Sequence, residues 1–203
     1  MKLETYIENE IIPRYLGFDR AHGPEHAKSV IDRSLKLAEI YGLDLRMVYA
    51  AAAYHDTGLA DGRERHHLVS GRIIREDRML REWFTEEQIE TIAEAAEDHR
   101  ASAAREPRSI YGRVLAEADR QIDPELTVRR TVQYGLSHYH EMGKEEHWRR
   151  MLEHLQEKYA EGGYLKLLIP ESDNARRLEE LRSLMKDRSR LREIFEKEYS
   201  EGA

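Results

Sequence analysis

Apolar residues recur every three or four positions through most of the chain, a spacing that predicts amphipathic helices. Pro24 and Asp44 mark two helix starts, because Pro fits the first helical position and Asp can cap a helix. Thr85 and Gln88 form the capping-box pattern of a third start. We expect an all-α protein with helices over about residues 2–16, 24–41, 45–55, 68–83, 85–99 and 110–120, one beginning at Pro124, and charged helices over about 131–159 and 175–199.

The segment 45–55 is the most apolar of these elements and contains four consecutive alanines, residues 50–53. Side chains this small let neighbouring helices approach closely, so we expect this helix to be central and buried. The hydrophobic residues, 40% of the chain, suffice for a core, and a length of 203 residues predicts a single domain.

The charge and composition of the chain argue against some classes of protein and limit the kinds of metal ligand. The 33 Lys and Arg residues against 40 Asp and Glu give a net charge of −7, which argues against a specific nucleic-acid binder. The chain has no apolar run of about 18 residues and no signal-peptide pattern, so we expect a cytoplasmic protein that does not bind a membrane. Because the sequence has no Cys, any metal site must use His and carboxylate ligands.

The pair His55-Asp56 ends the most apolar helix, where burial would make an unpartnered carboxylate costly. A divalent ion would explain the pair, since imidazole and carboxylate both bind such ions; a helix cap or a buried His–Asp hydrogen bond is the alternative. His26 lies in the first turn of the preceding helix, and Asp119 ends a later one. We favour His26 over His22 as a ligand because a Gly-Pro pair separates His22 from the helix.

The order of these residues resembles the signature of the HD-domain metal-dependent phosphohydrolases. A His-Gly-x-x-His start, an Ala-rich helix leading into His-Asp-x-Gly and a late Asp all occur within residues 20–125. The resemblance implies an HD-type helical bundle over about 20–125, with a C-terminal helical extension over about 126–203. It also implies four metal ligands: His26, His55, Asp56 and Asp119.

Many members of that family carry further His ligands and a second metal, with the Asp of the pair as a bridge. His66, His67 and His99 are available for this role. Adjacent helical residues point about 100° apart, so His66 and His67 should not both face one site. We favour His67, together with His99, which shares a helix face with the apolar Ile92; surface positions for all three remain the alternative.

Positive charge near the metal would hold a phosphate, and the planar Arg fork suits this task. Arginines cluster close to the expected ligands in the sequence. We predict Arg63, Arg65 and Arg108 as phosphate-binding residues, and Asp56, His99 and Arg100 as the catalytic residues. Further basic residues in the same neighbourhood are Arg20, Lys28, Arg105 and Arg120.

The predicted function is hydrolysis of a phosphomonoester or phosphodiester by metal-activated water, with a small phosphorylated substrate, a nucleotide, as partner. One or two divalent ions per chain are expected, from Mn, Fe, Co, Ni, Zn or Mg, and His-rich ligation disfavours Mg. A catalytically silent ligand-sensing or regulatory protein is the alternative, and a helical DNA-binding regulator has least support. The last helical segment either covers the domain or pairs two chains into a homodimer.

Overall fold

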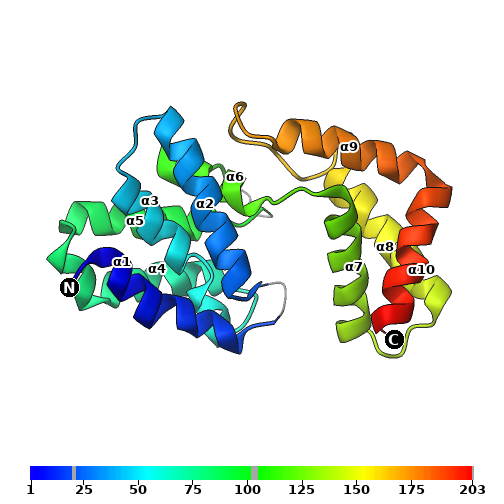
Figure 1. The fold of residues 1–203 in the computed structure, drawn as a ribbon, viewed down its shortest axis with the longest axis horizontal. Helices are drawn as coiled ribbons and strands as arrows, with labels where there is room; N and C mark the ends of the chain where they lie inside the picture. Colours follow the sequence, from blue (N-terminus) through cyan, green and yellow to red (C-terminus); the bar gives the residue numbers. More distant parts are fainter. Residues whose placement is uncertain (20–21, 102–104, 203) are drawn as a thin grey trace. The chain divides into compact units, whose positions relative to one another are not determined.

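The structure, a computed structural model, describes residues 1–19, 22–101 and 105–202, and these contain helices and loops but no strand. The prediction of an all-α protein is confirmed. None of the helices in these ranges combines the length and the apolar character needed to cross a membrane. Figure 1 labels the α-helices among the elements. The elements are α1 (Leu3–Tyr6), η1 (Ile7–Ile11), η2 (Ile12–Gly17), α2 (Pro24–Ile40), α3 (Leu45–Tyr54), η4 (Thr57–Asp61), α4 (His66–Glu76), η5 (Arg78–Glu82), α5 (Glu86–Asp98), α6 (Ile110–Asp119), α7 (Pro124–His138), α8 (Lys144–Tyr159), α9 (Asn174–Lys186) and α10 (Arg188–Gly202).

The chain divides into two compact units. Unit 1 comprises Met1–Arg120 and Leu168–Ser172, and unit 2 comprises Gln121–Leu167 and Asp173–Ala203. The boundary after Arg120 lies close to the junction expected between the bundle and its C-terminal extension. Folding of the whole chain as a single domain stays a prediction.

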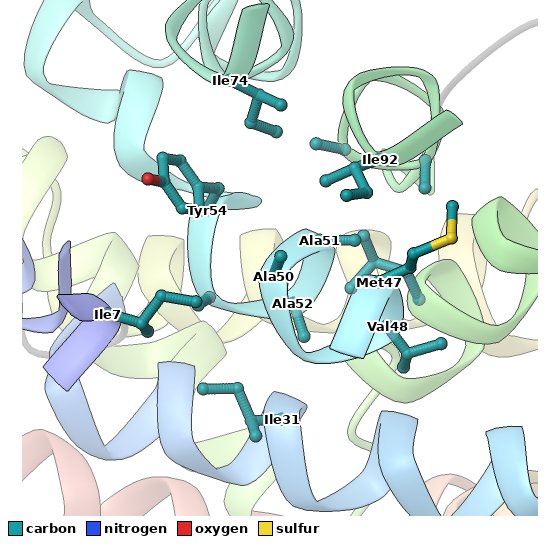
Figure 2. Close-up of a cluster of buried hydrophobic side chains, with 14 of the residues drawn as sticks. Ile7, Ile31, Met47, Val48, Ala50, Ala51, Ala52, Tyr54, Ile74 and Ile92 are labelled. Carbon is teal, nitrogen blue, oxygen red and sulfur yellow. The ribbon is translucent and has the colours of Figure 1, made fainter. Parts of the chain in front are cut away.

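Helix α3 lies in the middle of the core of unit 1, as predicted. Its four alanines are at most 2% exposed. Figure 2 shows Ile7 of η1, Ile31 of α2, Ile74 of α4 and Ile92 of α5 around this helix. The small alanine side chains therefore let several helices approach α3, which fixes its C-terminal end inside the unit.

Two predicted helix starts are confirmed by their caps. The Asp44 carboxylate accepts the backbone N–H of Arg46 and of Met47 at the start of α3. At the start of α5, Thr85 Oγ1 accepts the Gln88 N–H, and the Gln88 side chain accepts the Thr85 N–H. Each cap satisfies donors that the first helical turn would otherwise leave without partners.

The predicted helix over 68–83 is wrong in its extent, because Asp77 divides it into α4 and η5. The backbone of Asp77 is extended, with φ −73° and ψ 103°. Its carboxylate accepts hydrogen bonds from the hydroxyls of Tyr6, at 2.7 Å, and Tyr54, at 2.5 Å, and from the Met79 N–H, at 2.9 Å. These tertiary hydrogen bonds favour a break that periodicity alone does not reveal.

Unit 2 consists of α7 to α10 around a small apolar core, formed by Val128, Val132, Met151, Leu155, Leu191, Ile194 and Phe195. The two long charged helices predicted here are each divided in the structure. The first breaks before Gly143, whose N–H donates to Glu146 Oε2 at 2.7 Å and so caps α8. The second breaks at Asp187, whose carboxylate accepts the Arg190 N–H at 3.0 Å. In both cases a local polar cap starts a new helix inside a continuous amphipathic pattern.

Candidate metal centre

The C-terminal end of α3 presents His55 and Asp56 to the interior of unit 1. The last carbonyl groups of a helix have no partner within it. Here His55 Nδ1 lies 2.7 Å from the Ala52 carbonyl oxygen, and the Thr57 hydroxyl donates to the Tyr54 carbonyl at 2.7 Å. These local hydrogen bonds turn the chain sharply and fix the orientation of the His55 ring.

Gly58 allows the turn after His55-Asp56 to pack tightly against α4. Its N–H donates to Ser70 Oγ at 2.9 Å. A Cβ at this position would collide with the His66 carbonyl oxygen and would lie 2.7 Å from the Ser70 nitrogen. The absence of a side chain at Gly58 therefore brings the first turn of α4, with His66, next to Asp56.

The structure brings together the four ligands that the family resemblance implied. His26 Nε2, from the first turn of α2, lies 3.2 Å from Asp119 Oδ1 and 3.6 Å from Asp56 Oδ2. His55 Nε2 lies 3.3 Å from the same Asp56 oxygen and 3.8 Å from Asp119 Oδ1. His26, His55 and Asp56 meet the spacing needed to hold one ion.

A second group faces the other oxygen of Asp56. His66 Nε2 lies 3.3 Å from Asp56 Oδ1, and His99 Nε2 lies 3.4 Å from it. The two imidazole Nε2 atoms are 3.2 Å apart. Asp56, His66 and His99 also meet the spacing for one ion. The Asp56 carboxylate thus stands between two sets of ligand atoms, in the position of a bridge.

The centre is buried except at one edge. His55, Asp56 and His99 are each at most 3% exposed, and His26 and His66 are each 9% exposed. The side chain of Asp119 is 24% exposed. Asp119 is therefore the most exposed of the six candidate ligands.

The imidazole tautomers indicate that a cation fits between these groups. His55, His66 and His99 each place Nδ1 within 2.5–2.7 Å of the carbonyl oxygen three residues earlier, which can only accept a hydrogen bond. Nδ1 then carries the proton of the neutral ring, and the Nε2 lone pair points at the Asp56 carboxylate. Facing acceptors repel unless a cation or a proton lies between them. The donor set of imidazole nitrogens and carboxylate oxygens fits a divalent transition metal.

The pKa values of the cluster reflect the same convergence. Burial acts to lower the pKa of His26, but hydrogen bonds to Asp119 and Asp56 outweigh it and raise the pKa to about 9. Burial likewise opposes ionisation of Asp56, yet the neighbouring imidazoles, His55 first, hold its pKa well below the usual range. Burial, and then the charge of His99, lower the pKa of His66 to about 4. Protons and a metal ion therefore compete for this centre.

The geometry selects His66, whereas the sequence analysis favoured His67. The first residue of α4 is His66, and its ring reaches Asp56 because η4 packs against that turn. His67 is half-buried on a different side of the same turn. The helical argument that one of the two rings must point away holds; the position of η4, which decides between them, is tertiary and has no signal in the local sequence.

The predicted phosphate-binding arginines lie in different surroundings from one another. Arg63 is exposed and lies 3.9 Å from Asp19 Oδ2, and Arg65 is exposed at the start of α4. Arg100 donates to the Glu64 carbonyl at 2.6 Å. Arg20, in the wider group, lies outside the described residues. In the sequence, Arg63 and Arg65 precede His66, and Arg100 follows His99. The phosphate contacts of Arg63 and Arg65 and the catalytic role of Arg100 stay predictions.

Arg108 contacts carboxylates of α5 rather than the candidate centre. Its guanidinium donates to Glu94, Glu97 and the buried Asp98, at distances from 2.6 to 3.2 Å. Burial acts to lower its pKa, but these carboxylates, Asp98 first, outweigh it and raise the pKa above its usual value. The contacts tie the segment before α6 to α5, so the prediction of Arg108 as a phosphate ligand does not match its place in the structure.

Arg120, the residue after Asp119, carries hydrogen-bond donors that have no partner among the described residues. It follows Asp119 at the end of α6 and is half-buried. Its Nε and Nη1 atoms are buried and have no hydrogen-bond partner in the described part of the chain. Burial lowers its pKa from the usual value. Arg120 is one of several basic residues near the expected ligands in the sequence, and its burial distinguishes it from the exposed Lys28 and Arg105.

The sequence and the fold around these residues resemble those of known proteins. Residues 24–121 match the family model of the HD domain. The crystal structure of a predicted HD superfamily hydrolase from an uncultured Thermotogales bacterium superposes with a TM-score of 0.51. The two sequences are 20% identical, and the match covers 77% of this chain and 96% of the other, a likeness that shows the fold alone. No curated protein matches the sequence.

Proposed function

We propose that this chain, whose residues 24–121 match the HD-domain family model, is a metal-dependent phosphohydrolase acting on a phosphomonoester or phosphodiester, with a nucleotide as the expected substrate. At the coarser level, the family match and the likeness to the Thermotogales protein support an HD-type hydrolase. The observation that carries the finer proposal is the Asp56 carboxylate, whose two oxygens face separate pairs of imidazoles.

The chain's residues have distinct tasks in this proposal. His26, His55 and Asp119 would hold one divalent ion, and His66 and His99 a second, with Asp56 shared between them. Bound ions of this kind lower the pKa of water and stabilise negative charge on phosphoryl oxygens. The imidazole ligands favour Mn, Fe, Co, Ni or Zn over Mg.

Phosphate recognition is the task that we assign to Arg120. Its Nε and Nη1 groups are the two buried donors without partners described above. A phosphate oxygen would satisfy them and would keep the guanidinium charged in a half-buried position. The exposed Arg63 and Arg65 and the half-buried Arg100 would contact more distant parts of a substrate.

The test is phosphate release from a panel of nucleotides and simple phosphate esters, in the presence of Mn²⁺ or Fe²⁺. We expect turnover of at least one class of ester, abolished by a chelator and by Asp56→Asn. Activity that survives both treatments would contradict the proposal. Metal binding without turnover across the panel would favour the ligand-sensing alternative. A cytoplasmic location and a homodimer stay predictions.

A further inference from the structure

Tyr15 is a fully buried residue of η2 that lies outside the part of the chain matched by the HD family model. Its hydroxyl donates to the Ala53 carbonyl oxygen at 2.9 Å and accepts the Asp56 N–H at 3.2 Å. Its ring centroid lies 6.2 Å from that of His55. Tyr15 therefore binds the backbone on both sides of the His55 ligand.

The partners of the neighbouring carbonyl groups differ in origin. The Ala52 and Tyr54 carbonyls each accept from a side chain three residues later, so those hydrogen bonds are local. The Ala53 carbonyl accepts from Tyr15, which is 38 positions away in the chain. Local hydrogen bonds shape the turn, whereas the bond from Tyr15 fixes where the turn lies relative to the rest of unit 1.

We propose that the Tyr15 hydroxyl is a positioning group for the metal centre, and that it holds the Asp56 backbone so that both carboxylate oxygens face their imidazole pairs. The inference rests on the proposed function, because it concerns ligand geometry for divalent ions. Removing a hydrogen-bond partner that orients a metal ligand typically lowers the metal affinity by about 10- to 100-fold. Tyr15 itself contacts neither ion nor substrate in this proposal.

Tyr15→Phe separates positioning from packing, because it keeps the ring and removes the hydroxyl. Tyr6→Phe is the matched control. Tyr6 is also buried, at 8% exposed, and its hydroxyl also makes a short hydrogen bond, to Asp77 Oδ2 at 2.7 Å. Both variants should lower the thermal unfolding temperature, since each removes one buried hydrogen bond.

Mn²⁺ binding is then measured by calorimetric titration well below the unfolding temperature of each protein. We expect the dissociation constant to rise by about 10- to 100-fold in Tyr15→Phe and by less than about threefold in Tyr6→Phe. Equal affinity in wild type and Tyr15→Phe would overturn the inference while leaving the metal site itself intact. Absence of Mn²⁺ binding in the wild type would overturn the inference and the proposed metal site together, so the two failures are distinguishable.

Amide hydrogen exchange gives a second test that needs no variant. In the metal-free wild-type protein, the Asp56 N–H should exchange slowly, because the buried Tyr15 oxygen accepts it. Exchange of this amide at the rate of an exposed loop would overturn the inference. This readout applies even if Tyr15→Phe does not fold.

Discussion

Buried charge is handled differently in the two units. In unit 2, Glu198 is 4% exposed and its carboxylate accepts from Arg129 Nε at 3.0 Å. In unit 1, Asp56 is 3% exposed but contacts four imidazole nitrogens instead of a guanidinium. Glu198 has a partner that is always charged, whereas Asp56 has partners whose charge depends on protons or on a metal.

Unit 1 also contains the structural type of buried acid, which makes the comparison sharper. Asp98 is 4% exposed and is adjacent in sequence to His99, yet its carboxylate binds Arg105 and Arg108. Burial of an acid is therefore not the mark of the site. The distinguishing feature is the convergence of lone pairs from several elements on one carboxylate.

The largest expected effect comes from Asp56→Asn, which keeps the shape of the side chain but removes its charge. We expect loss of bound metal and a fall in phosphate-ester hydrolysis of about 10³-fold or more, because metal ions contribute several kcal/mol of transition-state stabilisation. Glu198→Gln is the matched change in unit 2 and should lower stability without changing metal content. Equal metal loss in both variants would remove the distinction between the two acids.

Next in size is Leu155→Ala, which opens a cavity in the core of unit 2, where Leu155 is fully buried. We expect a loss of about 2–5 kcal/mol in the free energy of unfolding, measured by urea denaturation. Leu152→Ala, at a half-buried position, should cost about 1 kcal/mol. Mn²⁺ affinity should be unchanged in both variants at low temperature; a tenfold loss would show that the centre depends on the core of unit 2.

His66→Gln and His67→Gln test which of two adjacent histidines belongs to the centre. We expect His66→Gln to reduce the metal content by about one ion per chain and hydrolysis by about 10²-fold. His67→Gln should resemble the wild type in both measurements. The reverse pattern would support the original choice of His67 and contradict the structure.

The smallest expected effect is a pH dependence in unit 2. Burial, followed by the charges of Lys158 and Arg150, lowers the pKa of His154 to about 4. Because this lies below the unfolded value of about 6.5, protonation favours the unfolded state, and stability falls as the pH drops from 6.5 toward 4. Between pH 7 and pH 5 we expect the free energy of unfolding to fall by about 1 kcal/mol, a figure that allows for the partial exposure of His154. The variant His154→Gln should not show this fall. An equal loss in the variant would assign the effect to other groups.

The sequence predicted much of unit 1 because its signals are local. The alanine run of α3 and the caps Asp44 and Thr85 are short-range patterns, whereas the set His26, His55, Asp56 and Asp119 was implied by the resemblance to a known family. Short-range patterns could not reveal that tyrosine hydroxyls would bind Asp77 and break a helix, or that two amphipathic stretches in unit 2 would divide at polar caps.

Two residues in or next to the centre could be identified only from the tertiary structure. The choice between His66 and His67 follows from where η4 packs, which Gly58 permits but does not specify. Tyr15 gave no signal because it lies 38 positions before its carbonyl partner and reads as one more apolar position of the first helix. For Arg108, the position in the sequence suggested a phosphate contact, whereas its partners in the structure are carboxylates of α5.

In the proposed function, Asp56 is shared between two divalent ions. Its most direct test is metal content, determined by mass spectrometry on wild-type protein and on Asp56→Asn after reconstitution with Mn²⁺. We expect about two ions per chain in the wild type and loss of both in the variant. A single ion or none in the wild type, or retention of two ions by Asp56→Asn, would contradict it.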